Sequence, residues 1–172
     1  MLNQSAESIL RKMESFDLSR MTALSFERLV RALAFELLGP SGIVYASGPD
    51  GARDFTIEGN IRGYEAKGWK GYLVLQAKFR ENPQLADNDI NWLGTQLNGE
   101  LKKYMDDAAG LRRPKYYIIA TNISLSGADG NAANGKRRTG GYTKVAKFLS
   151  TWKKEINLSD YDICHLQKSL IS

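Results

Sequence analysis

The fold of this chain is decided by an apolar stretch that ends in two polar residues, Tyr72-Leu73-Val74-Leu75-Gln76-Ala77-Lys78-Phe79. Its length and its content of aromatic and aliphatic residues predict a β-strand. Because side chains alternate along a strand, Leu73, Leu75, Ala77 and Phe79 share one apolar face, while the other face ends in Gln76 and Lys78, which lie side by side. Lysine is rarely fully buried without a partner, so an amide and an ammonium at the end of an apolar strand indicate a site.

A second strand with one polar face is expected upstream, after a Pro-Asp-Gly turn at residues 49–51. Polar and apolar residues alternate there in Asp54-Phe55-Thr56-Ile57-Glu58. If the two strands pair with their polar faces on the same side, Asp54, Gln76 and Lys78 converge. A carboxylate, an amide oxygen and an amine suit a hard divalent cation and an activated water. The alternative is a solvated strand face with an ordinary Asp–Lys pair, which composition alone does not exclude.

A helix is expected to precede these strands, because apolar residues recur at helical spacing over residues 26–38 and Gly39-Pro40 follows. Glu27 lies at the edge of its apolar stripe, from where it could reach over the sheet to a metal. The alternative role for Glu27 is that of an exposed partner for Arg31, one helical turn later.

The remaining pattern predicts an α/β sandwich, with a central mixed β-sheet flanked by helices in a single domain of 172 residues. The other expected elements are an amphipathic helix at 1–16, a strand at 43–47, an excursion at 59–71, a helix at 90–108, a strand at 116–121, a helix at 145–156 and a strand at 161–166.

Composition excludes several classes of protein. No apolar run approaches the ~20 residues of a membrane span, so no membrane association is expected. Cys164 is the only cysteine and His165 the only histidine. An intramolecular disulfide, a Cys/His zinc site and a histidine triad elsewhere in the chain are therefore excluded, and the composition fits a cytoplasmic protein.

The charge is unevenly distributed and favours a polyanionic partner for the second half of the chain. Residues 1–99 carry a net charge of −1 and residues 100–172 carry +6. A tract rich in Gly, Asn and Ser between residues 122 and 141 contains Lys136-Arg137-Arg138, and it is either a basic loop that contacts phosphates or a plain connection. Lys70 and Arg80, at the two ends of the decisive strand, are further candidates for contacts with nucleic acid.

Several motifs together resemble the Mrr-like restriction endonucleases of the PD-(D/E)xK nuclease superfamily, in which Gln commonly replaces the second acid. They are, in order, Ser25-Phe26-Glu27-Arg28-Leu29-Val30, Gly48-Pro49-Asp50-Gly51-Ala52-Arg53-Asp54, Trp69-Lys70-Gly71-Tyr72, Gln76-Ala77-Lys78 and Tyr116-Tyr117-Ile118-Ile119-Ala120-Thr121-Asn122. The similarity covers most of the chain.

The resemblance implies a restriction-endonuclease-like fold and a Mg²⁺-dependent (or Mn²⁺-dependent) DNA endonuclease. Asp54 would be the main metal ligand, Gln76 would bind through its side-chain oxygen and Ala77 through its carbonyl. Glu27 would bind the metal through water, and Lys78 would act on the attacking water. The alternative from a different class is a catalytically silent, nuclease-like module that binds nucleic acid or protein.

The resemblance also has implications for partners. A homodimer or higher oligomer is expected for double-strand cleavage. Many domains that this chain resembles form the N-terminal effector of longer prokaryotic restriction and antiphage defence proteins, so the resemblance implies a fused nucleoside-triphosphatase or sensor module. The chain stops at Leu170-Ile171-Ser172 within an apparent helix, which predicts a domain excised from a longer protein.

A competing assignment matches the literal superfamily pattern better. It pairs Pro49-Asp50 with Glu65-Ala66-Lys67. Glycines at 63, 68 and 71 predict a loop around Glu65 and Lys67, and a loop does not hold a catalytic pair rigidly. Gln76 and Lys78 on their strand are therefore preferred.

Overall fold

The structure is a computed structural model that describes residues 18–45, 53–84, 87–126, 130–131 and 137–166. Its elements are η1 (Leu18–Arg20), α2 (Ala23–Leu38), β1 (Ile43–Val44), β2 (Phe55–Asn60), η2 (Glu65–Lys67), β3 (Lys70–Lys78), α3 (Asp87–Met105), η3 (Asp107–Ala109), β4 (Tyr116–Thr121), β5 (Gly130–Asn131), β6 (Arg137–Arg138), α4 (Gly141–Glu155) and β7 (Asp160–His165).

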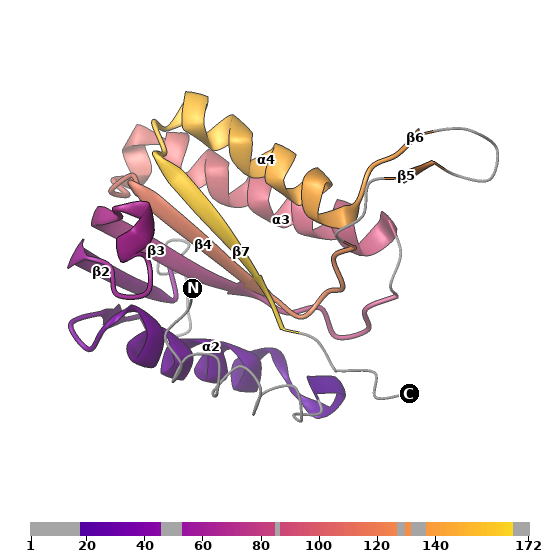
Figure 1. The fold of residues 1–172 in the computed structure, drawn as a ribbon, viewed down its shortest axis with the longest axis horizontal. Coiled ribbons are helices and arrows are strands. Elements are labelled where there is room, and N and C mark those ends of the chain that lie inside the picture. Colours follow the sequence, from indigo (N-terminus) through magenta and orange to yellow (C-terminus); the bar gives the residue numbers. More distant parts are fainter. Residues whose placement is uncertain (1–17, 46–52, 85–86, 127–129, 132–136, 167–172) are drawn as a thin grey trace.

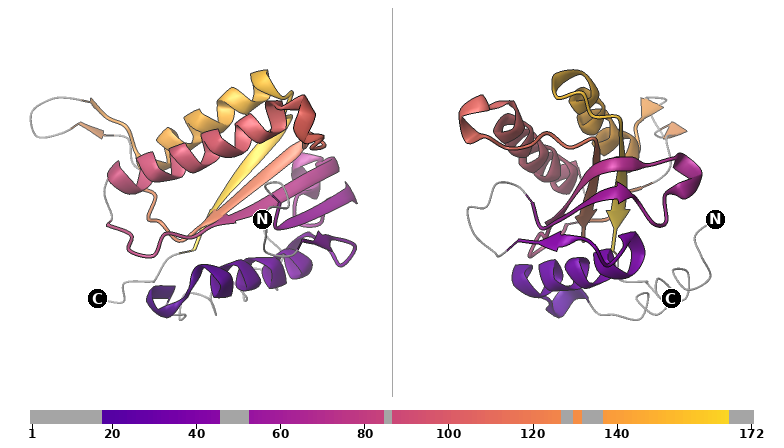
Figure 2. Two further views of the ribbon diagram at one scale, coloured as in Figure 1. Left: turned by 180° about the vertical axis from the view of Figure 1, so that it is seen from behind. Right: turned by 90° about the vertical axis from the view of Figure 1, so that its left-hand side faces the viewer.

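The main sheet has five strands in the order β1-β2-β3-β4-β7. Neighbours run antiparallel from β1 to β3 and parallel from β3 to β7, so the sheet is mixed. Helix α2 covers one face, and α3 and α4 lie together on the other (Figure 1). The view along the layers shows the same arrangement (Figure 2). The predicted α/β class, with a mixed sheet between helices, is confirmed.

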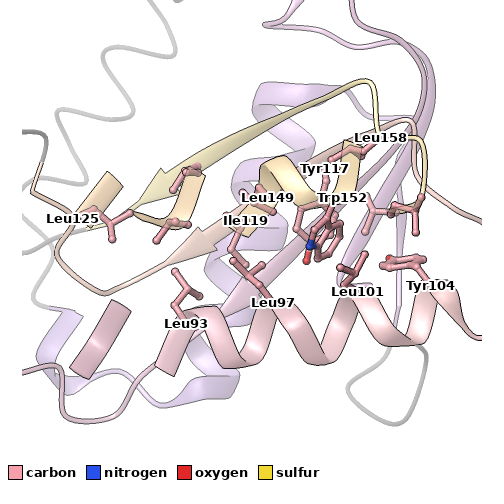
Figure 3. Packing of buried hydrophobic residues seen from close by; sticks show 14 of the residues in the cluster. Leu93, Leu97, Leu101, Tyr104, Tyr117, Ile119, Leu125, Leu149, Trp152 and Leu158 are labelled. Carbon is pink, nitrogen blue, oxygen red and sulfur yellow. The ribbon is translucent and has the colours of Figure 1, made fainter. Parts of the chain in front are cut away.

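Strand β3 is the centre of the sheet and contributes to two separate cores. Its Tyr72 and Val74 belong to the cluster under α3 and α4, in which Tyr117 and Trp152 are fully buried (Figure 3). Its apolar residues on the other face pack with α2 in a second cluster. The predicted alternation of faces along this strand is confirmed.

Helix α2 begins at a capping box formed by Thr22 and Ser25. The Thr22 hydroxyl accepts from the Ser25 backbone N–H, and the Ser25 hydroxyl accepts from the Thr22 backbone N–H. Both interactions satisfy backbone donors that a helix start leaves open. The helix ends at Gly39, whose φ of 127° is accessible mainly to glycine. These two ends fix the register that places Glu27 in the second turn.

The structure also differs from the predicted elements. The strand expected at 43–47 is only Ile43–Val44 in the described residues, and the predicted loop before α4 contains a short hairpin, β5–β6, which projects away from the body of the domain (Figure 2). The helices expected at 1–16 and at the C-terminus fall on residues outside the described ranges. None of the helices in those ranges combines the length and apolar content needed to cross a membrane.

Candidate active site

The site is built on Ala77, near the end of β3. Asp54 directly precedes β2 and extends the β2–β3 ladder, because its backbone N–H donates to the Leu75 carbonyl at 3.2 Å. Its carboxylate Oδ2 then accepts from the Ala77 N–H at 2.7 Å. The N–H and C=O of one strand residue point to the same edge, so the Ala77 carbonyl also faces Asp54. The carboxylate is thus held by the central strand and not by a loop.

Glu27 of α2 joins Asp54 to form an acid pair. The Glu27 carboxyl lies within hydrogen-bonding reach of Asp54. The Arg31 guanidinium forms an ion pair with Glu27 and lies 3.7 Å from Asp54 Oδ1. Arg31 is therefore a partner of Glu27, as one alternative predicted, but the pair is largely shielded from solvent and includes Asp54. Two adjacent carboxylates share one internal cation.

The environment raises the pKa of Asp54 to about 6. Burial is the main cause, since it penalises the charged form, and the nearby Glu27 carboxyl adds to it. The Ala77 N–H and the charge of Arg31 oppose the shift without cancelling it. The negative charge on the acid pair is therefore only partly compensated, and a further cation would stabilise it.

Gln76 and Lys78 point to the opposite face of β3, toward α3 and α4, and each is held by a neighbour. The buried Gln76 accepts through Oε1 from the Tyr117 hydroxyl of β4 at 2.5 Å. Lys78 Nζ donates to Glu100 Oε1 of α3 at 2.6 Å. Lys103 Nζ donates to the other Glu100 oxygen at 2.9 Å. Burial by itself would raise the pKa of Glu100, but the hydrogen bonds from the two lysines outweigh it and lower that pKa.

The expected convergence of Asp54, Gln76 and Lys78 on one face of the sheet is therefore wrong, and the four predicted residues lie around Ala77 as two groups. Asp54 and Glu27 lie on the side of α2, and Gln76 and Lys78 lie on the side of α3. Burial is the main cause that raises the pKa of Tyr117, the partner of Gln76, and Tyr104, Glu100 and, least of all, Asp54 add to it.

The oxygen atoms at this position suit a divalent metal. In the described part of the chain, no group of three or more His, Cys, Asp and Glu side chains is suitably placed to hold a metal. The donors near Ala77 are instead the two carboxylates and a backbone carbonyl on the side of α2, and the Gln76 amide oxygen on the other face of β3, where it accepts from Tyr117. All of these are hard oxygen ligands of the kind that Mg²⁺ and Mn²⁺ accept, and the incompletely compensated acid pair provides the charge.

The basic residues expected to contact nucleic acid do not cluster at this site. Lys70 is exposed at the other end of the nine-residue β3, roughly 25 Å from Lys78 at the usual rise per residue. Arg80 pairs with the buried Asp89, with Nε 2.9 Å from Oδ1. Lys136 falls outside the described residues. Arg137 and Arg138 form β6, and only their backbone is described.

The residues of the competing literal motif lie elsewhere. Glu65 and Lys67 form the exposed turn η2, outside the sheet. The Lys67 ammonium lies over the rings of Tyr64 and Trp69, at 5.4 and 5.3 Å from their centroids, and is 3.9 Å from Asp162. The prediction that this stretch is not a strand is confirmed. Asp50 lies outside the described residues.

Sequence analysis missed Glu100, and it missed Arg31 as a partner of Asp54. Glu100 had a detectable signal, because it lies three residues after Leu97 and four before Tyr104, on the buried stripe of α3. A charged residue on such a stripe requires a partner. Arg31 carried no comparable signal, since its contact with Asp54 depends on how α2 packs on the sheet.

Comparisons of the chain with protein-family models, with curated proteins and with solved structures give no match. The resemblance to Mrr-like nucleases therefore stays a prediction from motifs. The function proposed below therefore rests on the positions of Asp54, Glu27, Gln76 and Lys78 around Ala77.

Proposed function

We propose that this domain is a metal-dependent endonuclease that hydrolyses phosphodiester bonds in DNA, of the Mrr-like type and with a restriction-endonuclease-like fold. The observation that carries the proposal is the acid pair of Asp54 and Glu27, in which Asp54 accepts from the backbone N–H of Ala77, the residue between Gln76 and Lys78. Two carboxylates that could hold a hard metal ion, next to a half-buried lysine, are suited to phosphate chemistry.

Each residue has a distinct role in this proposal. Asp54 and Glu27 would hold Mg²⁺ or Mn²⁺, and further oxygen ligands would come from the Ala77 carbonyl and, from the other face of β3, the Gln76 amide. When bound, the metal provides a Lewis acid for the phosphate and lowers the pKa of a water molecule. Lys78 orients the attacking water and offsets negative charge on the phosphate. The Tyr117 hydroxyl fixes the rotamer of Gln76.

DNA is the proposed partner because the second half of the chain carries the net positive charge, +6 over residues 100–172 against −1 over residues 1–99. The hairpin β5–β6, which includes Arg137 and Arg138, leaves the sheet after β4. The ends of β4 and β3 are adjacent, since Thr121 pairs with Lys78. A basic projection next to the catalytic end of the sheet is placed to contact the phosphates that flank the cleaved bond.

The test is a cleavage assay on supercoiled plasmid with and without Mg²⁺. We expect metal-dependent nicking that is lost in Asp54→Asn and in Lys78→Ala. Gln76→Glu should keep activity, because it supplies an acid of nearly the same shape, whereas Gln76→Leu should lose it. Glu65→Ala is the matched control, an exposed acid of the competing motif, and should cleave like the wild type. Loss of activity in Glu65→Ala, with tolerance at Gln76 and Lys78, would contradict the assignment.

Cleavage of both strands should require two copies of the chain, because each copy has one candidate site and the two DNA backbones run antiparallel. A strictly monomeric form is expected only to nick. The measurement is the oligomeric state by analytical ultracentrifugation, combined with the ratio of linear to nicked product. Linear product whose rate rises in proportion to the concentration of a demonstrated monomer would contradict this.

A catalytically silent module is the second candidate. The observation that favours it is the internal compensation of charge, since Arg31 pairs with the acid pair and Glu100 pairs with Lys78. Such a module would bind DNA or protein equally well with and without divalent metal. Absence of cleavage, together with unchanged melting temperature in Mg²⁺, Mn²⁺ and Ca²⁺, would favour it over the nuclease.

A further inference from the structure

We propose that Glu100 is a positioning residue, which holds the Lys78 ammonium in place beside the Ala77 site. The proposal rests on the proposed function in one respect, namely that Lys78 acts in catalysis. Lys78 Nζ and Glu100 Oε1 are 2.6 Å apart, and the two side chains are only 16% and 6% exposed. This pair is therefore unlike the surface ion pairs that contribute little to a structure.

The location of Glu100 in α3 is costly and therefore informative. Its neighbours on the helix stripe, Leu97, Leu101 and Tyr104, belong to the buried core. A carboxylate among such residues carries a desolvation penalty that an apolar residue would avoid. In the structure Lys78 and Lys103 offset this penalty, because both donate hydrogen bonds to the Glu100 carboxylate. The buried position of Glu100 is therefore stabilised by its contact with the Lys78 ammonium.

Glu100 is also itself oriented. Lys103, one turn later on α3, donates to Oε2 at 2.9 Å and leaves Oε1 directed at Lys78. A lysine side chain has four rotatable bonds and would otherwise sample many positions. The chain Lys103–Glu100–Lys78 removes that freedom, as the Tyr117 hydroxyl does for Gln76. Catalytic groups require such a supporting shell of contacts to act at a defined position.

The first measurement does not depend on cleavage. Ammonium protons of an exposed lysine exchange rapidly with water, whereas those in a shielded ion pair exchange slowly enough to be observed by NMR. We expect one protected ¹⁵Nζ resonance, assigned to Lys78 by its loss in Lys78→Met. This resonance should disappear in Glu100→Gln and persist in Glu58→Gln, which alters an exposed acid paired with Arg112.

The second measurement is kinetic. Glu100→Gln should lower kcat by about 10- to 100-fold, the effect expected for a displaced catalytic group, and should leave KM for DNA within about twofold of wild type. Glu100→Asp retains the charge on a shorter side chain and should recover part of kcat. Glu58→Gln should match wild type. If Glu100→Gln does not fold, Glu100→Asp carries the test, with a weakened resonance and an intermediate kcat expected.

The outcomes separate this inference from the proposed function. Wild-type protein that fails to cleave DNA with metal would overturn the proposed function and, with it, this role. Wild-type cleavage together with an unchanged kcat in the folded Glu100 variants would overturn the role of Glu100 alone. A Lys78 resonance that survives in Glu100→Gln would likewise show that another group holds the ammonium.

Discussion

At the scale of single residues, Arg31 contacts the two carboxylates that the proposed metal would also need. The guanidinium compensates part of the negative charge on Glu27 and Asp54. Arg31→Met should therefore lower the melting temperature in the absence of metal. It should also raise the affinity for Mn²⁺ by at least an order of magnitude, since a unit charge at ~4 Å acts with several kcal/mol in a partly shielded site.

Calorimetric titration with Mn²⁺ and thermal melting with and without the metal would check this. The matched control is Arg28→Met, which removes an exposed arginine from the same helix and the same net charge. Equal Mn²⁺ affinities for Arg31→Met and wild type would show that the metal binds away from the acid pair.

The raised pKa of Asp54 makes metal binding dependent on pH. The carboxyl must lose its proton before it can ligate, and with a pKa of about 6 it is largely protonated at pH 5. Each pH unit below the pKa lowers the ionised fraction of a carboxyl group by about tenfold. Lowering the pH from 7.5 to 5 should therefore weaken Mn²⁺ binding by about tenfold, because most of Asp54 is then protonated. With an ordinary aspartate value, almost no change would occur. A titration at both pH values measures the effect, and Asp54→Asn should show weak binding at each.

At the scale of elements, Phe55 anchors the start of β2 and hence the position of Asp54. Its ring is fully buried and lies against Gly42, where an added Cβ would overlap it. Gly42→Ala should destabilise the fold by about 1–3 kcal/mol through overpacking. At roughly 2–4 °C per kcal/mol, this is a clear fall in melting temperature. Gly99→Ala is the control in open space within α3, and should stabilise by about 1 kcal/mol. A melting temperature that is unchanged in Gly42→Ala would show that the strand can shift.

Most elements were predictable because their sequence signals are local. The apolar period of residues 26–38 and its Gly39-Pro40 end indicated α2, and the alternation in Tyr72–Phe79 indicated both faces of β3. The hairpin β5–β6 was not predictable, since a tract of Gly, Asn and Ser has no strand propensity and its pairing depends on the turn between the two strands.

The site was only partly predictable from sequence for a different reason. Strand alternation correctly predicted that Gln76 and Lys78 lie on the same face of β3. The turn signal at residues 49–51 correctly predicted that a strand begins close to Asp54. The separation of Asp54 from Gln76 and Lys78 could not be predicted from strand alternation. Asp54 precedes the regular part of β2, and its carboxylate turns to the strand edge, where it accepts from the Ala77 N–H. The contacts of Arg31 and Glu100 depend on helix packing, on which periodicity gives no information.

At the scale of the whole molecule, the basic tract determines how the proposed nuclease should respond to salt. Replacing Lys136, Arg137 and Arg138 together by Ala should weaken DNA binding and reduce the slope of log affinity against log salt. The expected reduction is about 0.9 for each phosphate that the variant no longer neutralises. The melting temperature should change little, since the hairpin projects from the domain (Figure 2). Fluorescence anisotropy with a labelled duplex at several salt concentrations provides the slope.

The matched control removes the same charge from another region. Lys102, Lys153 and Lys154 lie in the last turns of α3 and α4 and are exposed. Their replacement by Ala should leave the slope close to that of wild type. Equal slopes for the two triple variants would mean that net charge, and not the hairpin, governs binding.

The mixed pairing of β3 has a consequence for the order in which the chain acquires its structure. Strands β2 and β3 are separated in sequence only by a short connection, whereas β3 and β4 are separated by the whole of α3. Contacts distant in sequence form more slowly, so Asp54 can meet Ala77 early, while Tyr117 reaches Gln76 only after the crossover is complete. A reaction that needs both contacts of Ala77's neighbours could therefore begin only after β4 has been synthesised and has docked on β3.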